Sequence, residues 1–265
     1  MTEKKVKTNL RWPGGKSKMT KYLDTYLPET CDKYLETFTG GGSVLLYIIQ
    51  KYNPKLVYAN DIDSQLINYY NNVKENPIKI INECLEIKNN FTSETFKEGF
   101  KTLDRENASH FFIANKTSFS GLNKNYSQLA YDRNFSHKSI EQISNISETI
   151  QNVNFLNEDY SNLENVIDNL EGFFIYLDPP YYSNKEKGLY GNKGKLHKEF
   201  DHKKLFEFVE RISKKNKVML SYDGCSYIRD LYKNYNIINF DFKYSMTNVG
   251  GNLCKEGEEL IITNY

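Results

Sequence analysis

Four consecutive residues, Asp178, Pro179, Pro180 and Tyr181, follow the apolar run FFIYL at 173–177. The run is typical of a buried strand, and prolines end a strand because each removes a backbone donor and fixes φ. In open α/β sheets, ligands bind at the carboxyl ends of the strands. There, Asp178 can accept one N–H of a planar amine, the Pro179 carbonyl can accept the other, and Tyr181 can stack on the ring. The tetrad therefore predicts a site that holds a planar amine; a simple proline turn is the alternative.

A glycine-rich turn, E-T-F-T-G-G-G-S, occupies 36–43 after an earlier predicted strand. Gly40, Gly41 and Gly42 let a ligand approach the backbone where a side chain would clash. The helix that follows offers its N-terminal amides to a carboxylate or phosphate. Position 45 is Leu, so the dinucleotide fingerprint G-x-G-x-x-G is incomplete and a pyrophosphate is disfavoured. A purely structural turn is the alternative.

An acidic residue, Asp61, ends the next predicted strand. It lies about 20 residues after the glycines, the spacing at which an acid accepts hydrogen bonds from ribose hydroxyls. The alternative is a helix cap, which Asp63 or Ser64 can equally supply.

The N-terminal stretch L-R-W-P-G-G-K (10–16) ends like a phosphate loop, but Leu10 replaces its first glycine. We therefore exclude a nucleoside-triphosphate site. Trp12 and Lys16 can line a ligand pocket, with Lys16 facing an anionic group. Core packing is the alternative for Trp12.

Seven β-type runs and intervening helical patterns must position these residues. The runs occupy 34–37, 56–60, 153–157, 173–177, 217–222, 236–240 and 259–265, and helical patterns occupy 15–27, 43–52, 64–75, 160–169, 201–215 and 225–233. Their alternation predicts a doubly wound α/β sheet. Ser64 and Asp201 are expected to be helix N-caps.

Residues 64–150 interrupt this alternation. Further helices are expected at 77–88, 93–107 and 139–150, around an irregular polar and aromatic stretch at 117–136. We interpret 64–150 as an inserted subdomain, with 1–63 and 151–265 forming the main domain. An ordinary helical cover is the alternative.

Composition limits the class of protein. The net charge of the 265 residues is +1, so nucleic-acid contacts must come from local basic patches. The four cysteines are scattered without a CxxC pair, which argues against a zinc site and disulfides. The absence of a long apolar run or a signal-peptide core predicts a cytoplasmic protein without membrane contact.

Together these motifs resemble the Dam-type DNA adenine methyltransferases, which use S-adenosylmethionine (AdoMet). The resemblance covers nearly the whole chain and keeps the family's motif order: R-W-P-G-G-K (11–16), E-T-F-T-G-G-G-S (36–43), N-D-I-D (60–63), N-E-D-Y (157–160), D-P-P-Y (178–181) and E-E-L-I-I-T-N-Y (258–265). It implies a mostly parallel, seven-stranded, Rossmann-like methyltransferase sheet with a helical target-recognition insert.

The resemblance also implies the reaction and its residues. Asp178, Pro179, Pro180 and Tyr181 would hold a flipped adenine of a short duplex DNA site during methylation of its N6 amine. None of the cysteines lies in a Pro-Cys motif, which disfavours C5-cytosine chemistry. The residues implied to bind AdoMet are Trp12, Gly15, Lys16, Phe38, Gly40, Gly41, Gly42, Ser43, Asp61, Ile62, Asp159, Tyr160 and Asp178.

The DNA-reading part of the insert matches the family only partly. N-K-T-S-F-S-G-L-N-K-N-Y (115–126) resembles its N-x-x-x-F-x-G-L segment, but the following family pattern is lost and the aromatic wedge shifts to Tyr126. The resemblance therefore does not imply recognition of GATC. Expected DNA contacts are Arg11, Lys116, Ser118, Asn123, Lys124, Tyr126 and Arg133. A Lys- and Gly-rich loop at 183–204 is expected to close over DNA; an ordinary surface loop is the alternative.

Two other functions remain open from the sequence. The first is methylation of RNA or of a protein glutamine, whose enzymes more often carry Asn-Pro-Pro-Tyr. The second is a non-catalytic protein that binds DNA or AdoMet. The expected partner is double-stranded DNA, a cognate restriction endonuclease is a further candidate, and the expected state is a monomer or weak dimer.

Overall fold

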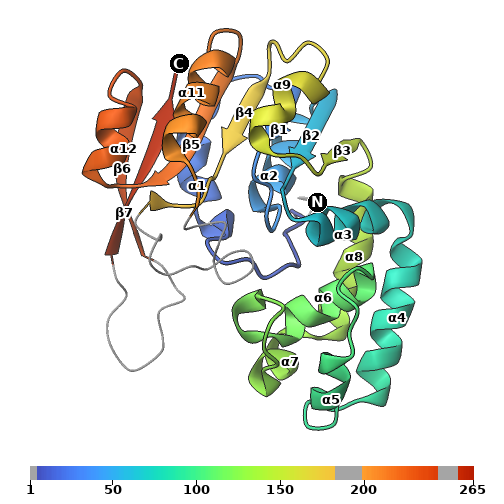
Figure 1. Cartoon of the computed structure of the whole chain (residues 1–265). Helices are drawn as coiled ribbons and strands as arrows, with labels where there is room; N and C mark the ends of the chain where they lie inside the picture. Colours follow the sequence, from blue (N-terminus) through green and yellow to red (C-terminus); the bar gives the residue numbers. More distant parts are fainter. Residues whose placement is uncertain (1–4, 183–198, 244–255) are drawn as a thin grey trace. The chain divides into compact units, whose positions relative to one another are not determined.

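The computed structural model describes residues 5–182, 199–243 and 256–265. Within these ranges, seven strands form a sheet in the order β3-β2-β1-β4-β5-β7-β6 (Figure 1). Their bounds are β1 Lys33–Glu36, β2 Leu56–Asn60, β3 Val153–Leu156, β4 Phe174–Leu177, β5 Lys217–Asp223, β6 Asn236–Lys243 and β7 Glu256–Thr263. β1 pairs with β4, β2 with β3 and β4 with β5 in parallel, whereas β7 is antiparallel to β5 and β6. The expected mostly parallel, seven-stranded α/β sheet is confirmed.

The chain forms two compact units. Unit 1 comprises Met1–Thr20 and Thr39–Asp159, and unit 2 comprises Lys21–Phe38 and Tyr160–Tyr265. The glycine turn and Asp61 belong to unit 1, whereas the tetrad belongs to unit 2. Among the described residues, we find no helix with the length and apolarity needed to cross a bilayer.

Unit 1 has α2 (Ser43–Tyr52) before β2 and a series of helices between β2 and β3. These are α3 (Ser64–Glu75), α4 (Pro77–Asn90), α5 (Phe96–Lys101), α6 (Ala108–Thr117), α7 (Gln128–Asn134) and α8 (His137–Thr149). Figure 1 shows α6 lying among the helices of this series, and it packs against α3, α4 and α7. The series falls within the expected insert at 64–150.

The sequence prediction missed α6 and α7. From Ala108 to Thr117, nine of the ten residues of α6 are buried, His110 being the exception. A helix buried on nearly all sides has no polar stripe, so its sequence lacks the helical repeat that a surface helix shows. The α7 segment was expected to be irregular, yet the Ser127 side chain caps it by accepting from the Ala130 amide.

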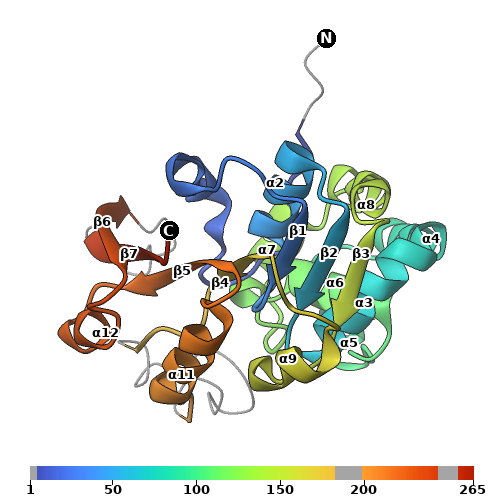
Figure 2. The same cartoon turned by 90° about the horizontal axis from the view of Figure 1, so that it is seen from above.

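Unit 2 contains the helices α9 (Leu163–Val166), α11 (His202–Ile212) and α12 (Ser226–Leu231). Figure 2 shows α11 and α12 on one side of strands β5 to β7. β4 is buried throughout, and β5 is buried from Val218 to Asp223. The helix expected at 15–27 is instead broken into η1 (Lys16–Lys18), α1 (Thr20–Leu23) and η2 (Asp24–Tyr26).

The two expected helix caps have different outcomes. Asp201 caps α11, because its carboxylate accepts from the amides of Lys203 and Lys204. The expected cap at Ser64 is wrong: the Asp63 carboxylate accepts the α3 amides, and Ser64 is the first helical residue. Asp63 has the extended backbone that the cap position requires, with φ −78° and ψ 102°.

We expect Asp63→Ala to lower the free energy of unfolding by about 1 kcal/mol, since it removes an N-cap acceptor. Ser64→Ala is the matched control, with an expected change within about 0.5 kcal/mol. Urea denaturation followed by circular dichroism measures both. A larger loss for Ser64→Ala than for Asp63→Ala would contradict the assignment.

Candidate active site

The carboxylate of Asp178 accepts from a serine hydroxyl in unit 2, which a tyrosine hydroxyl holds in turn. Asp178 follows the last residue of β4, and Ser221 on β5 donates from Oγ to Asp178 Oδ1 at 2.9 Å. The Tyr176 hydroxyl lies 2.8 Å from Ser221 Oγ. Because the single Ser221 proton is directed to Asp178, Tyr176 must donate to the serine oxygen. One oxygen of the Asp178 carboxylate is therefore oriented by a chain of buried hydroxyls.

Tyr181 is fixed at its hydroxyl and along its ring. The hydroxyl donates to Glu259 Oε2 on β7 at 2.6 Å, and the ring lies against Tyr222 with centroids 6.0 Å apart and planes 26° apart. Burial, and then the charge of Asp178, raise the pKa of Tyr181 well above its ordinary value. The hydroxyl therefore remains a donor near neutral pH, and the ring packs against Tyr222.

Tyr182, to which the sequence assigned no role, packs within unit 2. Its amide donates to Asp223 Oδ1 at 3.0 Å. Its ring stacks on Tyr227 at a centroid distance of 4.6 Å and meets the edge of His202 at 5.2 Å. The His202 ring is hydrogen-bonded in turn to the Tyr222 hydroxyl. The residues after β4 are thus anchored to β5 and its neighbours.

Two predicted cofactor residues, Phe38 and Tyr160, lie together in unit 2. Their ring centroids are 5.6 Å apart, and Phe200 lies 6.0 Å from Phe38 and 5.7 Å from Tyr160. Tyr160 also packs against Phe208 of α11. Phe38 follows β1 and keeps partial exposure, so this cluster can present an aromatic surface at the carboxyl end of that strand.

The glycine turn of unit 1 packs directly against Trp12. A Cβ on Gly40 would lie 2.6 Å from Trp12 Nε1, and one on Gly41 would lie 2.8 Å from Trp12 Cβ. Gly42 has φ +68°, and a Cβ there would meet the Tyr70 hydroxyl at 2.7 Å. The protein itself therefore requires these glycines. Gly42 is also the N-cap of α2 and, lacking a side chain, leaves the cap without a side-chain hydrogen bond.

Asp61 joins the glycine turn to the start of α3. Its Oδ2 accepts from the Gly40 amide at 2.8 Å, and its Oδ1 accepts from the Asp63 amide at 3.0 Å. Burial raises its pKa from 3.8 to about 6, although these backbone donors oppose the shift. The carboxylate is thus ionised and hydrogen-bonded at neutral pH.

Two asparagines that the sequence prediction missed tie Asp61 to the N-E-D-Y segment. Asn60 Oδ1 accepts from the Glu158 amide and its Nδ2 donates to the Glu158 carbonyl, both at 3.0 Å. Asn157 Nδ2 donates to the Asp61 carbonyl at 2.9 Å. These bonds align the segments that follow β2 and β3.

The other predicted cofactor residues of unit 1 have varied surroundings. Lys16 is buried, and its Nζ donates to the Gly14 carbonyl at 3.0 Å. The Gly15 amide donates to the Trp12 carbonyl at 3.0 Å, and Ser43 Oγ lies 2.9 Å from Ser17 Oγ. The side chains of Ile62 and Asp159 are exposed.

Arg11 is linked to the segment that begins at Asn115. Its amide donates to Asn115 Oδ1 at 2.9 Å, and its Nη1 donates to the Ser118 carbonyl at 3.0 Å. Lys116 and Ser118, two of the expected DNA contacts, are buried in this structure. Burial, and then Arg11, lower the pKa of Lys116 to about 8.

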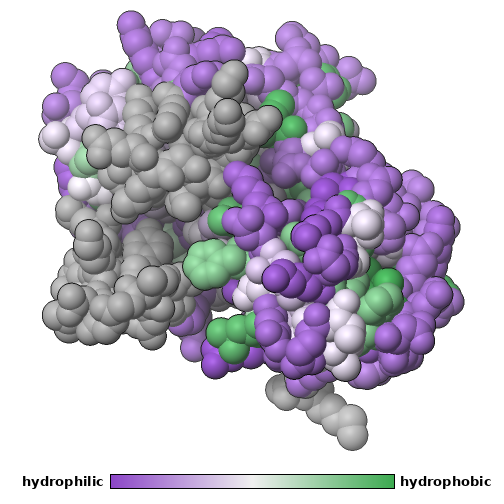
Figure 3. All heavy atoms as spheres, turned by 60° about the horizontal axis from the view of Figure 1, so that its bottom comes forward, coloured by the Kyte–Doolittle hydropathy of each residue, from purple (hydrophilic) through white to green (hydrophobic). Residues whose placement is uncertain are grey.

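Tyr126, the expected aromatic wedge, is partly exposed and packs within unit 1. Its hydroxyl donates to the Ser93 carbonyl, and its ring packs on Phe96 and Phe100 of α5. Tyr126 pairs with Ser118 in an antiparallel bridge, and Phe119 follows Ser118 with 59% of its surface exposed. Figure 3 shows a few hydrophobic side chains standing out from a largely hydrophilic face.

The remaining DNA candidates lie in or beyond this turn. Lys124 and Arg133 are exposed, and Asn123 adopts a left-handed backbone with φ +59°. The loop expected to close over DNA spans 183–204, and its part from 183 to 198 lies outside the described residues.

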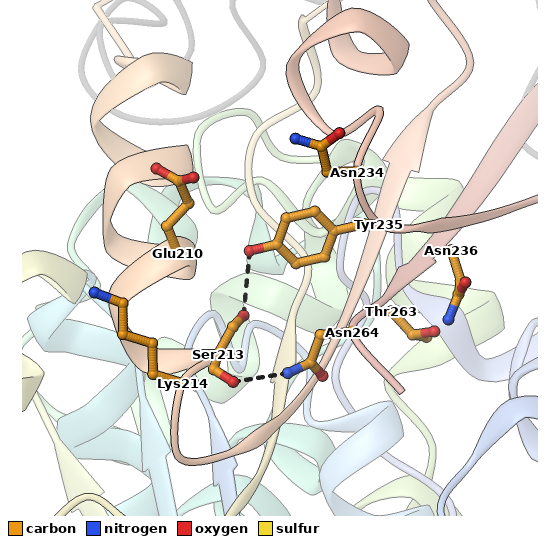
Figure 4. Close-up of a pocket in the computed structure, with 8 residues that line it drawn as sticks. All are labelled: Glu210, Ser213, Lys214, Asn234, Tyr235, Asn236, Thr263 and Asn264. Atoms are coloured by element: carbon orange, nitrogen blue, oxygen red, sulfur yellow. Dashed lines mark hydrogen bonds between the residues drawn. The ribbon is translucent and has the colours of Figure 1, made fainter.

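A polar pocket of about 360 Å³ lies elsewhere in unit 2 (Figure 4). It is lined by Glu210, Ser213, Lys214, Asn234, Tyr235, Asn236, Thr263 and Asn264. Asn264 Oδ1 accepts from the Val218 amide near the start of β5, and its Nδ2 donates to the Ser213 carbonyl. Because the tetrad follows the end of β4, which is parallel to β5, the pocket lies toward the other end of these strands.

Asp61 should make the free energy of unfolding depend on pH. Its pKa of about 6 exceeds the ordinary 3.8, so between these values the folded protein holds the proton more tightly than the unfolded chain. The free energy of unfolding, taken relative to Asp61→Asn, should therefore rise as the pH falls from 7 to about 4. Denaturation of both proteins across this range measures the difference, and a difference that falls or stays constant would contradict the raised pKa.

The site can be compared with known proteins. The family model described as D12 class N6 adenine-specific DNA methyltransferase matches residues 12–246. The Type II methyltransferase M.MjaIII of Methanocaldococcus jannaschii is 30% identical over 98% of this chain and 99% of its own. The Type II methyltransferase M1.LlaDCHI of Lactococcus lactis subsp. cremoris is 29% identical over 98% of each chain. The DNA adenine methylase of Vibrio cholerae serotype O1 is 25% identical over 96% of this chain and 95% of its own. The chain therefore belongs to the D12 class N6 adenine-specific DNA methyltransferase family.

Proposed function

We propose that Asp178 and the Pro179 carbonyl hold the N6 amine of a flipped adenine while it is methylated, with Tyr181 stacking on the base. Family membership gives the reaction, which is AdoMet-dependent methylation of adenine in DNA. The observation that carries the residue assignment is the Asp178 carboxylate, fixed at the carboxyl end of β4 by Ser221. An oriented carboxylate beside a rigid proline segment suits an amine that must be gripped in one direction.

The tetrad can activate a poor nucleophile. The lone pair of the adenine amine is delocalised into the ring. Two acceptors that draw its hydrogens out of the ring plane favour a tetrahedral nitrogen with a localised lone pair. AdoMet supplies a methyl group on a sulfonium, which is a good leaving group, so no covalent enzyme intermediate is needed. Asp178 and Pro179 serve as acceptors, and Tyr181, whose ring packs against Tyr222, offers a face to the base.

The residues present also fit AdoMet. In unit 1, the amides of the first turn of α2, which has no side-chain cap, suit the methionine carboxylate. The ionised Asp61 suits the ribose hydroxyls, because each carboxylate oxygen can accept more than one hydrogen bond. In unit 2, Phe38 and Tyr160 suit the adenine ring of AdoMet.

We assign DNA contact to helices α3 to α8 and the turn between α6 and α7. Arg11, Lys124 and Arg133 retain exposure and can meet phosphates or bases. Phe119 takes the wedge role expected of Tyr126, since it is the exposed aromatic ring beside the Ser118–Tyr126 bridge. Two relatives are named Type II methyltransferases, which supports a cognate restriction endonuclease as a partner.

Asp178→Ala should abolish methyl transfer while leaving AdoMet affinity largely intact, because the carboxylate is proposed to hold the substrate amine. Transfer of tritium from labelled AdoMet into DNA, RNA and protein measures the activity and its substrate, and calorimetry measures AdoMet affinity. Asp168→Ala, an exposed acid of the same unit, is the control and should behave as wild type. Normal turnover by Asp178→Ala would overturn the mechanism, and label in RNA or protein alone would overturn the substrate.

Phe119→Ala should lower kcat/KM on duplex DNA about 10-fold, because base–aromatic stacking is worth roughly 1–3 kcal/mol. The loss should be smaller on DNA whose target adenine is already unpaired, since the wedge then has less to do. Leu129→Ala is the matched control: Leu129 is 57% exposed on α7 and should be dispensable. Equal losses for the two variants would show only a general effect of surface hydrophobicity.

A further inference from the structure

We propose that Ser221 and Glu259 are positioning residues for the tetrad, Ser221 through Asp178 and Glu259 through Tyr181. This inference rests on the proposed function of the tetrad. Neither residue belongs to the tetrad, and both are at most 1% exposed within unit 2.

Ser221 sets the direction of the Asp178 carboxylate. The terminal torsion of an aspartate is broad, so the carboxylate plane is free to rotate unless a partner fixes it. The Ser221 hydroxyl donates to Asp178 Oδ1 at 2.9 Å and is itself bonded to the Tyr176 hydroxyl at 2.8 Å. Linked hydrogen bonds in a buried site polarise one another, so the donor held by Tyr176 binds the carboxylate more firmly. The chain thus fixes one oxygen and, with it, the direction of the other.

Glu259 sets the plane of the Tyr181 ring. The Tyr181 hydroxyl is held 2.6 Å from Glu259 Oε2, and Tyr222 lies against the ring. A phenol held at its hydroxyl and against a neighbouring ring has little freedom to turn. The Tyr181 ring is therefore presented in a defined plane before any base arrives, which lowers the ordering cost of binding.

The position of Glu259 lowers the stability of the fold, which supports a functional role for this residue. Glu259 pairs with Asp223 in the antiparallel β5–β7 ladder, and both side chains are buried. Acidic residues directly opposite each other destabilise a sheet, and a buried carboxylate adds a desolvation penalty. Both acids accept from the segment after β4: Glu259 from the Tyr181 hydroxyl and Asp223 from the Tyr182 amide. The unfavourable pair therefore lies where its two members hold the segment that contains the tetrad.

The first experiment compares Ser221→Ala with Ser221→Thr. Loss of a hydrogen bond to a charged group should lower kcat about 10- to 100-fold, with the KM for AdoMet within about twofold of wild type. Ser221→Thr keeps the hydroxyl and should recover most of the loss. The matched control is Ser213→Ala: Ser213 also bonds a tyrosine hydroxyl, that of Tyr235 at 3.3 Å, but lies in the pocket of Figure 4. It should leave kcat unchanged.

The second experiment compares Glu259→Ala with Glu259→Gln. The amide oxygen of glutamine can still accept from Tyr181, so the Gln variant should keep more activity than the Ala variant. Glu259→Ala and Tyr181→Phe break the same bond, so their combination should lower kcat less than the product of the two single effects. Independent, multiplicative losses would overturn the pairing.

Comparison of the unfolding midpoint with kcat distinguishes a purely structural role from a positioning role. If Ser221→Ala and Glu259→Ala lower the unfolding midpoint but leave kcat within twofold, the inference is wrong. If Ser221→Ala fails to fold, Tyr176→Phe replaces it, since it removes only the hydroxyl that bonds Ser221; an unchanged kcat would then overturn the Ser221 role. If Glu259→Ala fails to fold, Tyr181→Phe replaces it, since it removes only the hydroxyl that bonds Glu259; an unchanged kcat would then overturn the Glu259 role. Full activity of Asp178→Ala in the same assays would instead overturn the proposed function.

Discussion

The pairing of β4 with β5 is the constraint on which the arrangement of the tetrad depends. Leu177 lies opposite Leu220 in the parallel register, so the next residues, Asp178 and Ser221, come within hydrogen-bonding reach. The antiparallel register of β5 with β7 likewise places Glu259 within reach of Tyr181. A slip of one residue in either pairing would turn these side chains to the other face of the sheet. The apolar contacts that set the strand register therefore also determine which side chains can bond the tetrad.

Unit 1 follows the same principle through its loops. The Asp61 carboxylate reaches the Gly40 amide because the turn after β1 contains residues without side chains, and Trp12 occupies the space that those side chains would need. The glycines that the sequence analysis associated with a ligand are therefore needed by the fold itself. Asn60 then joins the loop after β2 to the loop after β3.

Local patterns made the strands and the motif residues predictable, since an apolar run and the tetrad behind it can be read from neighbouring positions. The roles of Ser221 and Glu259 could not be found in this way, because their bonds join residues 43 and 78 positions apart. Glu259 lies in the motif at 258–265, but that motif does not show that its partner is Tyr181. The α6 helix was missed because it is buried on nearly all sides. The packing of Tyr126 against α5 could not be predicted either, because residue type alone does not say which aromatic ring is covered.

The contact between Trp12 and the glycine turn has an optical consequence. Trp12 is the single tryptophan among 265 residues, so the indole emission of the protein comes from one position. That indole lies against Gly40 and Gly41, whose amides precede the first turn of α2. Its fluorescence therefore reports on the surroundings of a single indole, which include this turn. The intrinsic fluorescence of Trp12 can therefore follow changes near the glycine motif without an added label.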